Sequence, residues 1–173
     1  MTVRPGVEVS VARAVLARAT VGALQAAAAP APASLGLIFA DDVELAALNA
    51  EHMGHEGPTD VLSFPLLPRS AFPRHEGQPA DDRSADGDES VAFRLPPGRR
   101  THLGDVVVSV ERAREQAGQG RGGQTGDVSW SVADEVRLLV VHGTLHVCGW
   151  DHARPAEEAA MRSLERRILE ETR

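Results

Sequence analysis

Three of the seven histidines in the chain lie within eleven residues, in the segment HGTLHVCGWDH that starts at His142. In an α-helix, His142 and His146 would be ~40° apart around the axis and ~6 Å apart along it, so both imidazoles could face one point. Gly149 favours a reversal of the chain after the helix, which would bring His152 back to that point. The spacing therefore predicts a metal site.

Imidazole nitrogen is a common ligand of zinc, and three protein ligands leave one tetrahedral position for water or substrate. We therefore expect one zinc ion (Zn2+) per chain, held by His142, His146 and His152, in an open site of the catalytic kind. Two histidines at helical spacing are often surface or satisfied core residues, but the third one, beyond a helix-ending glycine, argues for a metal. Cys148 projects ~100° away from its neighbours on the helix, and we expect it to be a small core residue.

A similar histidine spacing, H-x3-H-x5-H, occurs in zinc proteases of the metzincin type. In those enzymes the residue directly after the first histidine is a glutamate that acts as general base. Gly143 occupies this position here and has no side chain that could accept a proton. Peptide hydrolysis is therefore disfavoured unless another carboxylate substitutes.

Four further residues are candidates for the chemistry. Asp151 is the nearest carboxylate in the sequence and could support a ligand imidazole or transfer a proton in catalysis, although a turn residue after Gly149 explains it equally well. Polar side chains alternate in the segment PTDVLSFP and could line a substrate-binding cleft: Thr59, Asp60 and Ser63. It is equally compatible with the sequence that Thr59 and Asp60 cap the start of the strand and that Ser63 is a packed small residue.

The hydrophobic pattern predicts an α+β fold in one domain, with a mixed sheet of about four strands packed with about five helices. We expect strands at residues 6–10, 35–40, 58–65 and 103–110. Helices are expected at 11–28, 41–53, about 111–117, 131–149 and 155–171. The helix ends are indicated by Asp41 or Asp42, Gly54, the pair Ser131 and Asp134, and Pro155.

Residues 68–100 differ from the rest of the chain. They are rich in Pro, Gly, Asp, Arg and Ser and show little apolar periodicity, which predicts a mobile acidic insertion with a short ordered piece at 91–95. Such a segment cannot bury enough apolar surface to offset its ordering entropy, so we expect it to be dispensable for folding. Residues 118–126 are expected to form a flexible loop.

The composition limits the function classes. A formal net charge of −7 argues against a broadly basic nucleic-acid surface. Every basic residue is an arginine, however, and the guanidinium fork suits phosphate, so a local basic cleft is compatible with the charge. A single cysteine excludes an internal disulfide and favours a reducing, cytoplasmic location. The sequence contains no run of ~18 uncharged apolar residues, so no membrane span is predicted.

The histidine segment HGTLHVCGWDH resembles the signature of the YbeY family of bacterial rRNA maturation factors, in which three histidines bind one zinc. The segments at 48–65 and 102–117 agree with the same family, and the resemblance covers roughly residues 34–65 and 102–170. It implies a metal-dependent, single-strand-specific endoribonuclease (a hydrolase) in 16S rRNA 3′-end maturation and ribosome quality control. Its implied partners are the 16S rRNA precursor and ribosomal small-subunit proteins.

The chain departs from this family at two places. Many relatives have an arginine where this chain has Met53, and that arginine is implied in RNA cleavage. A thioether cannot stabilise charge on a phosphate, and we name Arg137 as a substitute that could bind the substrate. The insertion is also longer than the family's usual connection. Two alternatives therefore stay open: a ribosome-assembly factor that binds rRNA and proteins with little catalysis, and a zinc peptidase.

Overall fold

The structure is a computed structural model of the chain, and it describes residues 1–78, 100–119 and 130–173. At its centre lies a four-stranded sheet in the order β1-β2-β4-β3. Its strands are β1 (Thr2–Val3), β2 (Ala33–Ala40), β3 (Val61–Pro65) and β4 (Thr101–Ser109). The strands β1, β2 and β4 run parallel, and β3 runs antiparallel to β4. The predicted mixed sheet of four strands is confirmed.

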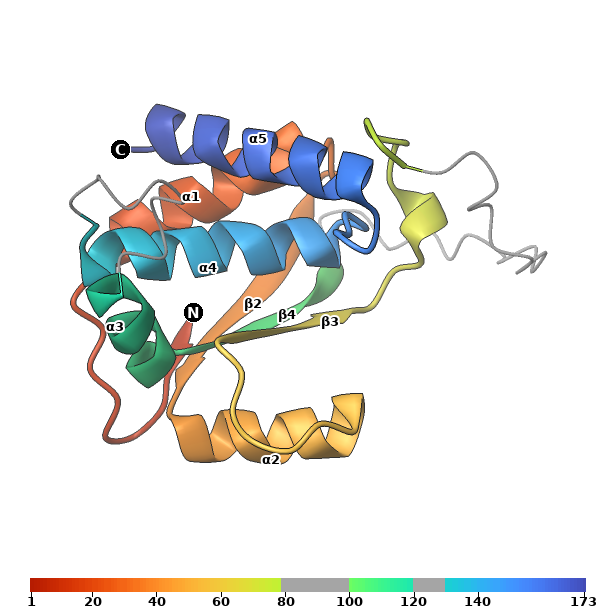
Figure 1. The fold of residues 1–173 in the computed structure, drawn as a ribbon. Coiled ribbons are helices and arrows are strands. Elements are labelled where there is room, and N and C mark those ends of the chain that lie inside the picture. The colour runs from red at the N-terminus through yellow and green to blue at the C-terminus, as the bar shows by residue number, and fades with distance from the viewer. Residues whose placement is uncertain (79–99, 120–129) are drawn as a thin grey trace.

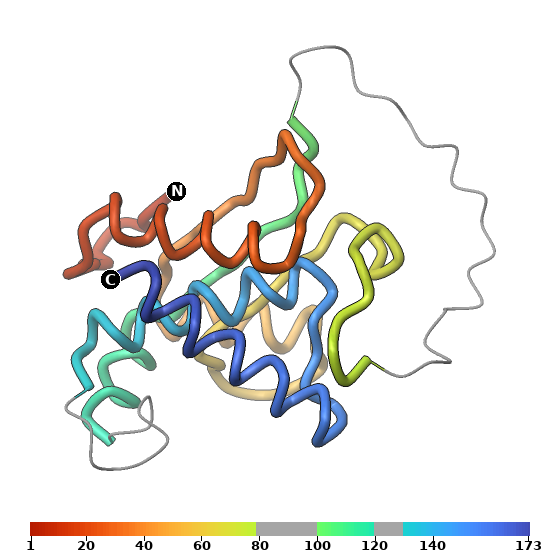
Figure 2. The backbone as a smooth tube through the Cα atoms, turned by 90° about the horizontal axis from the view of Figure 1, so that it is seen from above, coloured from red at the N-terminus to blue at the C-terminus, as the bar shows by residue number. Residues whose placement is uncertain are grey.

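Five α-helices surround this sheet in the part of the chain that the structure describes. They are α1 (Arg13–Ala26), α2 (Asp42–Met53), α3 (Val110–Gly118), α4 (Val132–Val147) and α5 (Pro155–Glu171). Figure 1 shows α2 below the sheet and α4 above it, while α1 and α5 form a further layer over α4. In the view from above, α5 lies beside α1 (Figure 2). The protein is therefore a single α+β domain in which α4 is the central helix.

Two apolar clusters hold α4 in this central position. The cluster between α4 and the sheet includes Phe39, Val106, Val108 and Val140. The cluster between α4 and the outer helices includes Ala19, Leu145, Met161 and Ile168. Most residues of α4 are buried as a result. The helix is therefore held in place on both faces, and so are the side chains that it carries.

The helix ends match the sequence signals. The side chain of Asp41 accepts a hydrogen bond from the backbone N–H of Glu44 at the start of α2, and Gly54 ends that helix in the left-handed region. Ser131 and Asp134 form a capping box at the start of α4. Pro155 lies in the first turn of α5. The ends of α2, α4 and α5 that carry these signals were therefore predictable.

Two expected strands differ from the structure. Residues 6–10 do not form a strand, because Gly6 has φ +81° in a turn where the N–H of Val7 bonds to the carbonyl of Arg4. The first strand is instead the two-residue β1. The strand expected at 58–65 begins only at Val61, so the residues before it belong to the loop that follows α2.

The first residues of the expected insertion are ordered against the domain. Residues 69–71 form a short 3-10 helix (η1, Arg69–Ala71), and Phe72 after it is only 7% exposed and packs in the cluster of Leu145 and Met161. This stretch therefore packs against the rest of the domain. Residues 79–99, with the piece expected at 91–95, lie outside the described residues. The same holds for residues 120–126 of the loop expected at 118–126.

None of the helices in the described ranges is long and apolar enough to cross a membrane.

Candidate metal centre

Two of the three histidines project from α4, the central helix. His142 and His146 are one turn apart, and their imidazole centroids are 4.5 Å apart. Each ring is partly buried, while the residues around them on the helix, Val141, Gly143 and Leu145, are buried. The capping box fixes the start of α4 and the two apolar clusters fix its faces, so the rigid helix presents both rings from one side.

A tight reversal after α4 returns the third histidine to the other two. The N–H of Gly149 bonds to the carbonyl of His146, and the N–H of Trp150 bonds to the carbonyl of Leu145. This pair of bonds, with φ +84° at Gly149, is a Schellman motif. The His152 ring consequently lies 5.0 Å from that of His146 and 5.5 Å from that of His142. The predicted convergence is confirmed.

The donor atoms lie close enough together to bind one metal ion. One ligand nitrogen from each of His142, His146 and His152 lies within 4.8 Å of the other two. The Nε2 atoms of His142 and His146 are 3.0 Å apart. Two ligand atoms at ~2.0–2.1 Å from a tetrahedral zinc are ~3.3 Å apart, which is close to the spacing of the His142 and His146 nitrogens. The histidine group could therefore hold a metal.

A buried carboxylate on α5 orients one ligand ring. The Oε1 atom of Glu165 lies 2.7 Å from Nδ1 of His142, and the glutamate side chain is only 5% exposed. Because a carboxylate can only accept, it favours the proton on Nδ1 and leaves the Nε2 lone pair of His142 directed at the other histidines. Sequence reasoning missed Glu165, although an acid between Leu164 and Ile168 on the apolar face of α5 was a signal.

The electrostatics of the group favour the metal-binding form of the imidazole. Burial, followed by the neighbouring His142 and His152, lowers the pKa of His146 to about 4. Its ring is therefore neutral at physiological pH, as a metal ligand must be. Burial also raises the pKa of Cys148 to about 12, and the residue is 1% exposed within the apolar cluster of Leu145. Cys148 is thus a small core residue, as predicted.

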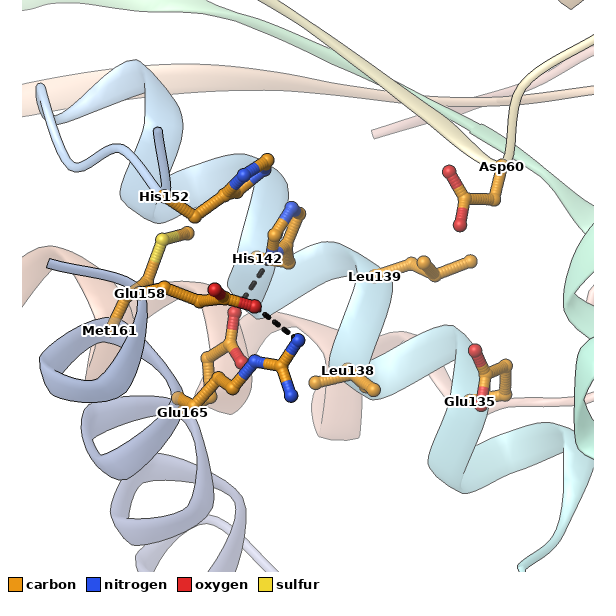
Figure 3. Close-up of a pocket in the computed structure, with 10 residues that line it drawn as sticks. Asp60, Glu135, Leu138, Leu139, His142, His152, Glu158, Met161 and Glu165 are labelled. Carbon is orange, nitrogen blue, oxygen red and sulfur yellow. Dashed lines mark hydrogen bonds and ion pairs between the residues drawn. The ribbon is translucent and has the colours of Figure 1, made fainter. Parts of the chain in front are cut away.

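A pocket of about 450 Å3 opens beside the histidines. Figure 3 shows His142 and His152 at one end and Asp60 beyond Leu139 at the other. The lining also includes Glu135, Leu138, Glu158, Met161, Arg162 and Glu165. The lining thus contains four carboxylates and a single arginine, Arg162. The side chain of Arg162 is half exposed and pairs with Glu158. The pocket has a suitable size for a nucleotide unit, but its charge is predominantly negative.

The three polar residues expected in a cleft occupy different positions. Asp60 lines the pocket, where it accepts hydrogen bonds from the side chain of Gln116 and the backbone N–H of Val61. Thr59 donates to Asp60. Ser63 instead donates to the carbonyl of Gly143 at 3.0 Å, which joins β3 to α4. Only Asp60 of this set lines the histidine pocket.

Arg137 and Asp151 have evident structural partners. Arg137 is 6% exposed and donates to the carbonyl of Leu169 and the hydroxyl of Thr172 near the end of α5. It does not line the histidine pocket, where the sequence analysis expected it to meet substrate. Asp151 accepts a hydrogen bond from the backbone N–H of His152 at 2.8 Å, as a turn residue does. Met53 is 44% exposed at the end of α2.

The fold and the site define a single-domain α+β protein with a histidine triad suited to a metal at the end of its central helix. The chain belongs to the YbeY family, because the family model described as Endoribonuclease YbeY matches residues 7–173.

Individual relatives agree with this assignment. The chain is 37% identical over 139 residues to the Endoribonuclease YbeY of a Roseiflexus species, an alignment that covers 80% of this chain and 69% of the relative. The match to the protein of the same name from a Chelativorans species is 34% identical over 161 residues and covers 92% and 78%. The solution structure of TM1509 from Thermotoga maritima has a TM-score of 0.53 at 17% identity, covering 99% of this chain and 87% of that one. The last match supports the fold alone.

Proposed function

We propose that this protein is a zinc-dependent endoribonuclease that cleaves single-stranded RNA. Membership of the YbeY endoribonuclease family supports an endoribonuclease role. The observation that carries the proposal is the convergence of His142, His146 and His152 on one point beside an open pocket. Three imidazoles with room for substrate correspond to a catalytic rather than a structural metal site.

Within this proposal the roles of the protein groups follow from their positions. A bound zinc ion would polarise a phosphoryl oxygen and acidify water. Glu165 holds the proton on Nδ1 of His142, and Arg162 is the one arginine in the lining that could donate to a phosphate oxygen. Asp151 is the candidate proton acceptor from the sequence, and Asp60, expected from the sequence to bind substrate, lines the pocket. The attacking oxygen belongs either to water or to the ribose 2′-OH.

The biological setting is also part of the proposal. We place the activity in the cytoplasm, in 3′-end maturation of the 16S rRNA precursor and in ribosome quality control, with ribosomal small-subunit proteins as partners. The single, buried cysteine is compatible with a reducing compartment. The single-strand preference is physically plausible because an unpaired nucleotide can enter a pocket of about 450 Å3, whereas a stacked and paired one cannot.

The decisive experiment combines metal analysis with RNA cleavage. Purified protein should contain about one zinc per chain, and it should cleave single-stranded but not double-stranded RNA until a chelator is added. His146→Ala should lose both metal and activity. A 2′,3′-cyclic phosphate on the products would identify attack by the 2′-OH. Cleavage that is unaffected by the chelator and by a triple alanine variant of the histidines would overturn the proposal.

A second candidate is an rRNA-binding assembly factor with little catalysis. One observation favours it: Asp60, Glu135, Glu158 and Glu165 make the pocket acidic. The family resemblance adds that Met53 stands at the position where it implies an arginine. In this case the protein would bind RNA with zinc present and leave it intact. The peptidase alternative is weaker still, because a Cβ at Gly143 would lie 2.5 Å from Val106 and 3.0 Å from Val61. A glutamate there would have to displace these valine side chains.

A further inference from the structure

The chain between β3 and residue 78 folds back onto the reversal that carries His152. Phe72 is buried in the cluster of Leu145 and Met161. A Cβ at Gly77 would be 2.7 Å from the backbone of Ala156, so the two segments touch at backbone level. Figure 1 shows this segment, in yellow-green, beside the start of α5. Residues 69–77 and 149–157 thus form one packed unit.

Four side chains make the connection, and we call them the clamp: Arg69, His75, Trp150 and Glu157. The imidazole of His75 stacks on the indole of Trp150 with centroids 3.8 Å apart and planes inclined by 11°. Its Nε2 atom is 3.3 Å from the carbonyl oxygen of Gly149 and 3.4 Å from Oε1 of Glu157.

The charges in the clamp are buried and mutually compensated. Glu157 is only 2% exposed, and the guanidinium of Arg69 forms an ion pair with it. A buried carboxylate without a partner is costly, so this pair fixes the position of the first turn of α5. The first turn also carries the positive end of the helix dipole, which favours a carboxylate there.

The clamp holds the chain on both sides of His152. Trp150 lies two residues before it and Glu157 lies five residues after it. His152 itself is exposed and lies on a non-helical turn. Its position relative to the α4 histidines therefore depends on how firmly the two flanks are fastened.

We propose that Arg69 and His75 are positioning residues for the metal site: through Trp150 and Glu157 they hold His152 where its imidazole meets those of His142 and His146. This inference rests on the proposed metal site. The physical reason is preorganisation, since a ligand that is already in place loses less conformational freedom when the metal binds. The start of the segment that the sequence marks as an insertion thus contributes to the proposed metal site.

The test measures metal binding rather than activity. We expect His75→Ala and Arg69→Met to raise the zinc dissociation constant about tenfold, within the range found for groups that orient metal ligands. The Co2+-loaded variants should show altered visible absorption bands, which report on coordination geometry. His75→Phe keeps a ring against Trp150 and should recover most of the affinity. The matched control is His55→Ala, which removes an exposed histidine outside the clamp.

The outcomes separate the clamp from the metal site itself. If the clamp variants lower only the thermal midpoint of the metal-free protein and leave the zinc constant and the cobalt spectrum unchanged, the clamp is purely structural and the proposal is overturned. Glu157→Gln keeps the side-chain volume and serves as a further variant if Arg69→Met does not fold. If His142→Ala also binds zinc as tightly as the wild type does, the metal site is misassigned and both proposals fail.

Discussion

The Nδ1 atom of His142 lies 2.7 Å from Oε1 of Glu165, and this contact joins the central helix α4 to α5 across 23 positions of sequence. Because the carboxylate is nearly buried, no water replaces it as the partner of the ring. Glu165 thereby favours one tautomer and orientation of the His142 ring. The orientation of the histidine group depends on the packing of α5.

Replacing Glu165 by glutamine should weaken metal binding. The amide keeps the shape but removes the negative charge that favours the Nδ1 proton, and we expect the zinc dissociation constant to rise about tenfold or more. Competition with a chromophoric chelator would measure it. Glu170→Gln, an exposed acid on the same helix, is the control and should change nothing. Equal affinities in the two variants would contradict the role of Glu165.

Phe72→Ala should destabilise the protein by about 3 kcal/mol, a typical cost for removing a buried phenyl ring. The residue is 7% exposed against the α4–α5 cluster. Urea unfolding would give the difference, and Leu66→Ala, at a position that is 62% exposed, should stay within about 0.5 kcal/mol of the wild type. Replacing residues 70–98 by a Gly/Ser linker would remove Phe72 and His75 together. A linker variant as stable as the wild type would show that this packing contributes little.

The sequence predicted those parts of the site that depend on local structure. Helical periodicity, a capping pair and one glycine suffice to place His142, His146 and His152 together, because each signal acts within a few residues. Glu165 was missed since its contact exists only once α4 and α5 have packed. Periodicity alone cannot say which helix faces another.

The same reason accounts for two places where the structure differs from the expected picture. Arg137 was a reasonable phosphate ligand by residue type, yet its guanidinium donates to the carbonyl of Leu169 and the hydroxyl of Thr172 near the end of α5. The polar composition of residues 68–100 hid one phenylalanine and one ion pair that fasten the segment at 69–77 to the domain. A few anchoring residues in a polar stretch do not change its average composition, so composition is a poor guide to where an insertion starts.

Arg162→Ala should weaken RNA binding if this arginine contacts a phosphate in the pocket. We expect a higher KM with a smaller change in kcat, and a salt dependence of RNA affinity whose slope is reduced by about one. Arg166→Ala removes an exposed arginine from the same helix outside the pocket lining and is the control. An identical loss in both variants would mean that RNA responds to the overall charge of α5 and not to the pocket.

Met53→Arg should raise the rate of cleavage of single-stranded RNA. A guanidinium can donate paired hydrogen bonds to phosphate oxygens as charge builds, while a thioether donates none, and such a group is worth about 10²–10³ in rate in other enzymes. We expect a smaller gain, on the order of tenfold, because nearby Glu56 could pair with the new side chain. Position 53 is 44% exposed, so the charge costs little to introduce. The two proteins must be compared at equal zinc content and equal stability. A wild type that already cleaves rapidly and is slowed by Met53→Arg would place charge stabilisation elsewhere, on the metal and Arg162.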